Sequence, residues 1–106
     1  MAIPQAYLQF KDSHPQLVSA YESLGEACRE AGPLDARTAA LVKLGIAMAS
    51  GLEGATHSAA RKALQAGCEK EEMLHAAVLA TTTLGFPAMM RARSWVVDVL
   101  EKNSSG

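Results

Sequence analysis

Hydrophobic residues recur along the chain at intervals of three and four positions, the spacing that gathers side chains on one face of an α-helix. Between Ser13 and the Gly32-Pro33 pair, the apolar stripe consists of Leu17, Tyr21, Leu24 and Cys28. No window alternates apolar and polar residues between turn signals, so no strand is predicted. The pattern predicts an all-α fold.

Turn-forming and capping residues divide this pattern into five main helices. Ser13 is the expected N-cap of the first, with Pro15 in its first turn. The glycines at 51, 67 and 85 each end a helix. The expected elements are 13–31, 35–50, 52–66, 68–84 and a last helix after Phe86-Pro87, preceded by an arm or short helix over 1–13 and followed by a frayed tail over 103–106.

The helix over 35–50 is nearly uncharged, and Asp35 is its expected N-cap. Between Ala39 and Ala49 the only charged residue is Lys43. A helix that is apolar almost all round is buried almost all round. In a chain this short, that indicates either a central helix or one that is also covered by a second subunit.

Length and composition indicate one compact domain over residues 1–106. The formal net charge is −1 and neither sign forms a long block. This argues against nucleic acid or a membrane surface as a partner. The N-terminus lacks the basic and apolar regions of a signal peptide, and Cys28 and Cys68 lie far apart, so a cytoplasmic protein with free thiols is expected.

Candidate chemistry lies just after Gly51, where Glu53, His57 and Arg61 are spaced four residues apart on one helix face. The functional interpretation assigns His57 to acid–base catalysis, Glu53 to orienting its imidazole, and Arg61 to holding an anionic substrate. The alternative is a solvated ladder of helical ion pairs, which is a common arrangement.

Other potential ligands and nucleophiles give weaker signals. His57 and His75 could form a metal pair, but no carboxylate or thiol completes the site at local ligand spacing, so no metal is predicted. Cys68 lies near a helix N-terminus, which would favour its thiolate, but a resting thiol is the expected role. No phosphate loop, nucleotide fingerprint or nucleophile elbow occurs, and no cofactor is predicted.

Several segments occur in a characteristic order. They are Leu34–Thr38, the buried helix and Gly51 hinge, Arg61–Gly67, Glu71-Glu72, and Leu84–Ala88. Their order and spacing resemble the carboxymuconolactone decarboxylase family, which includes the alkylhydroperoxidase D-like proteins. The resemblance covers about Leu34–Leu100.

The resemblance implies a compact all-α fold that assembles into homotrimers or hexamers. In the family's peroxidase branch, a CxxC pair is followed four residues later by a histidine, and a glutamate one helix earlier relays protons. The decarboxylase branch keeps the histidine and lacks the cysteines.

Aligning the ending Ala63–Gly67 with the family places the two cysteine positions on Leu52 and Ala55. The histidine position falls on Ala59 and the relay glutamate on Ala40. None of these side chains can carry a proton or act as a nucleophile. His57 lies two residues before the family's histidine position, about 200° around the helix, so it cannot inherit that role.

The sequence therefore predicts a divergent family member without the CxxC centre. We expect a non-redox lyase or isomerase that acts on a small acidic or lactone substrate through His57. One alternative is a non-catalytic binding or structural oligomer. A second is a peroxiredoxin-type alkylhydroperoxidase activity through a lone cysteine, Cys28 or Cys68. The expected partners are further copies of the chain, as a trimer or hexamer, and a small-molecule ligand.

Overall fold

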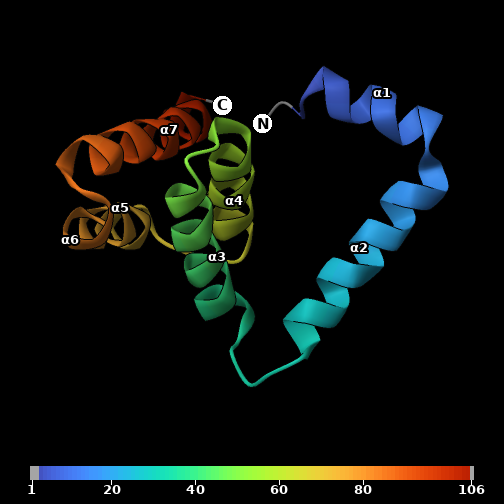
Figure 1. Cartoon of the computed structure of the whole chain (residues 1–106), viewed down its shortest axis with the longest axis horizontal. Coiled ribbons are helices and arrows are strands. Elements are labelled where there is room, and N and C mark those ends of the chain that lie inside the picture. The colour runs from blue at the N-terminus through green and yellow to red at the C-terminus, as the bar shows by residue number, and fades with distance from the viewer. Residues whose placement is uncertain (1–2, 106) are drawn as a thin grey trace. The chain divides into compact units, whose positions relative to one another are not determined.

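The computed structural model describes residues 3–105, with side chains as far as Asn103, and all of the regular secondary structure there is helical. The elements are α1 (Gln5–Ser13), α2 (Pro15–Glu30), α3 (Ala36–Ser50), α4 (Glu53–Gln65), α5 (Lys70–Leu79), α6 (Thr81–Leu84) and α7 (Phe86–Ser105), as labelled in Figure 1. The all-α prediction is confirmed. Within the described part of the chain, no helix is long and apolar enough to cross a membrane.

The chain divides into two compact units, Met1–Leu34 and Asp35–Gly106. The first contains α1 and α2, which meet at His14. The predicted stripe of α2 is largely exposed, with Tyr21 at 68%. The prediction of a single domain over 1–106 stays a prediction.

The predicted turn signals set most helix boundaries in the second unit. The Asp35 side chain accepts a hydrogen bond from the Thr38 backbone N–H at 2.7 Å and so caps α3. That N–H holds the pKa of Asp35 below its usual value, because it stabilises the ionised carboxylate. Gly51 ends α3 in the left-handed conformation, with φ 72°. Positive φ angles also occur at Gly67 and Gly85.

One predicted helix differs from the structure at its start. His14, not Ser13, is the N-cap of α2, and the Ser13 hydroxyl instead donates to the Gln9 carbonyl at the end of α1. The last helix, α7, extends to Ser105, and the frayed tail over 103–106 stays a prediction. Gly106 lies outside the described residues.

The helix predicted over 68–84 is two helices, α5 and α6, which brings the number of helices to seven within the described residues. A capping box between Glu69 and Glu72 starts α5. The break follows at Ala80, where the Thr81 hydroxyl donates to the Val78 carbonyl at 2.7 Å. Threonine hydroxyls compete in this way for helix carbonyls, and β-branched residues have low helix propensity.

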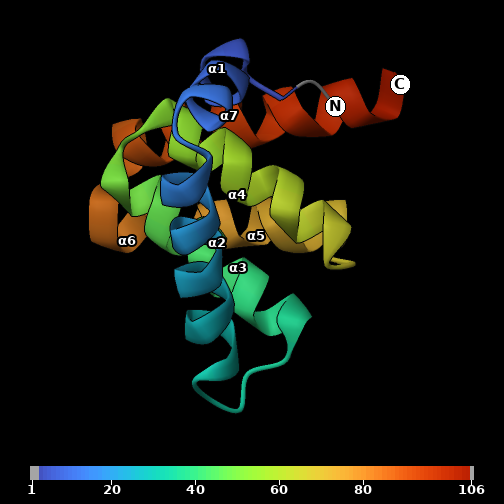
Figure 2. The ribbon, with the colours of Figure 1, turned by 90° about the vertical axis from the view of Figure 1, so that its right-hand side faces the viewer.

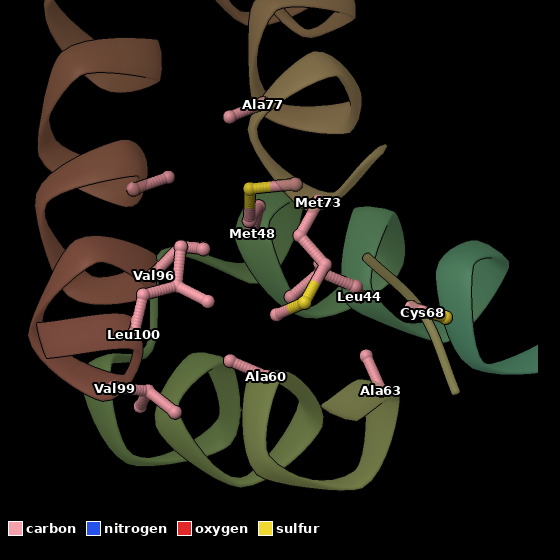
Figure 3. Packing of buried hydrophobic residues seen from close by; sticks show 11 residues of the cluster. Leu44, Met48, Ala60, Ala63, Cys68, Met73, Ala77, Val96, Val99 and Leu100 are labelled. Carbon is pink, nitrogen blue, oxygen red and sulfur yellow. The ribbon is translucent and has the colours of Figure 1, made fainter. Parts of the chain in front are cut away.

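The core of the second unit lies where α3, α4, α5 and α7 meet. In Figure 2, α3 and α4 lie side by side. Figure 3 shows Leu44, Met48, Met73 and Val96 converging between these helices, and all four are almost completely buried. Small side chains on α4, such as Ala60, let the helices approach closely. This packing gives α4 and α7 fixed positions relative to one another.

The helix α3 is less buried than its sequence predicts. Leu44 and Met48 face the core, whereas Val42 is 48% exposed and Ile46 is 64% exposed. Within the second unit by itself, α3 is therefore not buried all round. The physical reason is that this unit has only enough helices to cover one side of α3.

Candidate functional site

Three potential donor side chains meet where the first half of α4 faces α7. Glu53 and His57 lie one turn apart on α4, and Asp98 comes from α7. The His57 Nε2 atom lies 3.1 Å from Asp98 Oδ2. One ligand atom from each of Glu53, His57 and Asp98 lies within 4.8 Å of the others. We call these three residues the α4–α7 cluster.

The chemistry of Asp98 fixes the tautomer of His57. An ionised carboxylate only accepts hydrogen bonds, so Nε2 carries the proton and donates it to Asp98. The lone pair of the neutral imidazole then resides on Nδ1. The His57 side chain is 23% exposed and Asp98 is 50% exposed. The imidazole is thus oriented by its partner and still open to a small molecule.

Buried contacts hold the backbone beneath this cluster. Thr56, next to His57 in the sequence, has an exposure of 0%. Its hydroxyl lies 2.9 Å from the Leu52 carbonyl and 3.2 Å from the Ala47 carbonyl, which ties the start of α4 to the end of α3. On the α7 side, Val99 packs in the core beside Asp98. The site therefore rests on rigid helices rather than on loops.

Arg61 lies one turn beyond His57 on α4 and is partly buried. Within residues 3–103 its guanidinium takes part in no ion pair or side-chain hydrogen bond. The predicted Glu53–His57–Arg61 face is therefore not a continuous ladder of ion pairs. Asp98, rather than Glu53, makes the hydrogen bond to His57.

A second basic side chain, Arg91 of α7, lies close to Gly51, just before α4 begins. Its guanidinium lies 3.3 Å from where a side-chain carbon on Gly51 would be placed, and it stacks over the Trp95 ring at 5.5 Å. Arg91, Trp95 and Asp98 follow one face of α7 at helical spacing. Sequence reasoning did not single out this face.

Cys68 belongs to a different cluster, where the start of α3 meets the loop before α5. Its thiol is buried and lies 3.5 Å from the Arg37 carbonyl oxygen, to which it donates. The Arg37 guanidinium bonds to the Gly67 carbonyl and forms an ion pair with Glu72. Burial raises the pKa of Cys68, and the negative charge of Glu72 adds to the effect. Both effects oppose ionisation of the thiol, whereas a helix N-terminus would favour it.

The positions that the sequence analysis predicts for the family's peroxidase residues are occupied by apolar side chains. Leu52 is 62% exposed and is the N-cap of α4. Ala40 and Ala59 pack against the core as small apolar side chains. Two cysteines occur in the sequence, Cys28 and Cys68, so it has no CxxC pair. Cys28 is exposed on α2.

Asp98 is the residue that sequence reasoning missed. It lies 41 positions from His57, on the last helix, so no local spacing connects the two. The signal that could have found it is the helical register of α7, where Val96, Val99 and Leu100 face the core and Asp98 falls beside them. His75, considered earlier as a partner of His57, is exposed on α5 and is not part of the cluster.

Comparisons with known proteins agree with the fold. The model of the "Carboxymuconolactone decarboxylase family" matches residues 15–98. A crystal structure of a carboxymuconolactone decarboxylase family protein from Legionella pneumophila is similar to this chain, with a TM-score of 0.76 and 24% sequence identity. The similarity covers 92% of this chain and 86% of that one. No curated protein matches at a significant level. Because the family model matches most of the chain, the chain belongs to the carboxymuconolactone decarboxylase family.

Proposed function

We propose that this protein is a non-redox lyase or isomerase that acts on a small acidic or lactone substrate, with His57 transferring the proton. The observation that carries the proposal is the 3.1 Å hydrogen bond between His57 Nε2 and Asp98 Oδ2. A carboxylate that fixes the tautomer and stabilises the imidazolium is what a histidine acid–base catalyst requires.

The proposed step uses the free Nδ1 atom of His57. In an isomerisation, Nδ1 takes a proton from a carbon next to the substrate carbonyl and returns it to another carbon, so no electrons enter or leave. In a decarboxylation, the bond to the carboxylate carbon breaks and CO₂ leaves. The electron pair stays on the remaining carbon, which takes a proton from the His57 imidazolium. Asp98 stabilises the positive charge of that imidazolium in both cases.

A cationic side chain is needed to hold the carboxylate of such a substrate. Arg61 is the assigned clamp, since it lies one turn beyond His57 and is not engaged in an ion pair within the described residues. Arg91 is the other candidate, from the α7 side. Replacing each arginine in turn by Met shows which one binds the substrate carboxylate. Loss of that arginine should raise KM for a charged substrate and leave KM for a neutral lactone nearly unchanged.

The test is turnover of a panel of small lactones and unsaturated or β-keto acids, followed by proton NMR. We expect His57→Ala to lower kcat by about 10²–10⁴-fold, the usual contribution of a positioned acid–base group. Asp98→Asn should also lower kcat, because the amide can favour the wrong tautomer. His75→Ala is the matched control and should be neutral. Full activity in His57→Ala would refute the proposal, because His57 would then not be the acid–base catalyst.

The thiol-peroxidase alternative is weaker, because a peroxide-reducing thiol must ionise and Cys68 is buried with a raised pKa. The exposed Cys28 lacks a resolving cysteine nearby in the sequence. Peroxide consumption that persists in the double variant Cys28→Ser, Cys68→Ser excludes this alternative. Consumption that vanishes in that variant supports it.

A non-catalytic binding or structural oligomer is the second candidate function. The exposed apolar side of α3, with Val42 and Ile46, favours it. We propose that further copies of the chain cover this side in a trimer or hexamer. Light scattering after size exclusion should give the mass of such an oligomer, and Ile46→Lys should dissociate it. Glu71→Lys, a charge change on exposed α5 surface, is the control. A wild-type monomer at high concentration contradicts the assembly.

A further inference from the structure

We propose that Glu53, His57 and Asp98 form a binding site for one divalent transition-metal ion, with Zn²⁺ as the best match. This inference stands apart from the proposed reaction, since it concerns binding and not turnover. It rests on the placement of three donor side chains by two packed helices.

The distances suit a shared ion. Two ligand atoms on one tetrahedral zinc ion, each about 2.0–2.1 Å from the metal, lie about 3.4 Å apart. His57 Nε2 and Asp98 Oδ2 are already 3.1 Å apart. Glu53 supplies the third donor, and one ligand atom from each of the three residues lies within 4.8 Å of the others. The Glu53 side chain is exposed in the first turn of α4, so it has room to rotate toward an ion held by the other two residues.

The donor types also select the ion. One imidazole nitrogen and two carboxylate oxygens suit Zn²⁺, Co²⁺ or Mn²⁺ rather than Cu⁺, which prefers sulfur ligands. Three protein ligands leave an open position for water or for an oxygen of a small molecule, as in catalytic rather than structural zinc sites. The partial exposure of His57 and Asp98 gives an ion access to the site.

Electrostatics favour occupancy. Two carboxylates and a neutral imidazole place a formal charge of about −2 within a few ångströms, and like charges at that separation repel. In the metal-free state, the Nε2–H proton shared with Asp98 relieves part of this repulsion. A divalent cation would replace that proton and satisfy both carboxylates at once.

The site has a consequence for His57. An ion bound at Nε2 leaves Nδ1 protonated, so His57 can no longer accept a proton there. Metal binding and proton transfer by His57 therefore exclude one another. If the proposed reaction occurs, Zn²⁺ should inhibit it, and a chelator should restore it.

The experiment measures metal binding directly. The full chain carrying Cys28→Ser, which removes the exposed thiol as a competing ligand, is titrated with Zn²⁺ by calorimetry. Co²⁺ then serves as a spectroscopic probe, whose visible absorption reports coordination number. We expect one ion per chain.

Variants assign the ligands. His57→Ala and Asp98→Asn should each weaken Zn²⁺ binding by more than about tenfold, and Glu53→Gln by a smaller factor. His75→Ala and Glu71→Gln are matched controls outside the cluster and should leave binding unchanged. Far-UV circular dichroism confirms that each variant remains helical.

Two outcomes overturn the proposal. One is the absence of saturable Zn²⁺ binding up to about 1 mM, which is weaker than a three-ligand site should allow. The other is binding that is unchanged in both His57→Ala and Asp98→Asn. Either result leaves the acid–base function intact, because that function is judged by turnover in the metal-free protein.

Discussion

Replacing Gly51 by Ala is a direct test of the hinge that positions the α4–α7 cluster. Gly51 ends α3 with φ 72°, and its N–H bonds to the Met48 carbonyl at 3.2 Å. α4 begins two residues later, at Glu53. A side chain at position 51 is therefore forced into the left-handed region, or the start of α4 must shift.

Two effects determine how much Gly51→Ala changes the free energy of unfolding. The left-handed conformation costs a non-glycine residue about 1–2 kcal/mol. The added carbon would lie 3.3 Å from the end of the Arg91 side chain, which is exposed and flexible enough to move at little cost. We therefore expect Gly51→Ala to lower the free energy of unfolding by about 1–2 kcal/mol, which corresponds to about 4–15 °C in Tm for a domain of this size.

Gly45→Ala is the matched control, because it makes the same chemical change in the middle of α3. Nothing lies within 4 Å of a carbon added at Gly45, and its φ is not positive. Alanine is the better helix former, so this variant should be more stable than the wild type by about 0.5–1 kcal/mol. The same substitution is thus expected to change stability in opposite directions at two positions six residues apart.

Urea titration of both variants measures these changes. Trp95 is the only tryptophan and lies on α7, so its fluorescence reports on the unit that contains the site. Circular dichroism at 222 nm follows the helices in parallel, and an unchanged m-value shows that the midpoint shift reflects stability. A Gly51→Ala variant as stable as the wild type would refute the reasoning about the hinge. Destabilisation by Gly45→Ala would show that a partner packs against α3 at that point.

Three further predictions test other parts of the chain. Asp35→Asn keeps the capping group but not its charge. Folding lowers the pKa of Asp35, so the ionised side chain stabilises the fold fully at pH values above the ordinary pKa of 3.8. This stabilisation is lost as the pH falls through the lowered pKa of the folded state. The Tm of the wild type should therefore drop more steeply in acid than the Tm of the variant. Thr56→Val removes a buried hydroxyl that bridges two carbonyls and should cost about 1 kcal/mol in urea titration, while equal stability would show that the bridge contributes nothing. A thiol-specific disulfide reagent should modify Cys28 at once but Cys68 only after urea is added, and two equally fast thiols would contradict the burial of Cys68.

Only part of the candidate site could be predicted from the sequence. Glu53, His57 and Arg61 were found because a single helix defines their spacing. The role given to Glu53, orienting His57, depends on which carboxylate comes closest in three dimensions, and in the structure Asp98 makes that hydrogen bond. The sequence analysis looked for metal ligands only at local spacing along the chain. It could not find Asp98 on α7, which lies close to His57 only in three dimensions.

The sequence by itself determined the all-α fold, the family and most helix boundaries. These depend on short-range physics: apolar periodicity, the Asp35 cap and the glycines at 51, 67 and 85 act within a few residues. Even the misjudged helix over 68–84 failed for a local reason, the competition of Thr81 for a carbonyl.

Only the tertiary structure decided what surrounds each chemical group. It buried Cys68 beside Glu72, left one side of α3 uncovered within its own unit, and brought Asp98 to His57. These outcomes depend on how helices far apart in the sequence pack through a common core, and the crossing of α4 and α7 is set by small and large side chains fitting together there. Helical periodicity says which face of a helix is buried, but not which residue of a distant helix faces it.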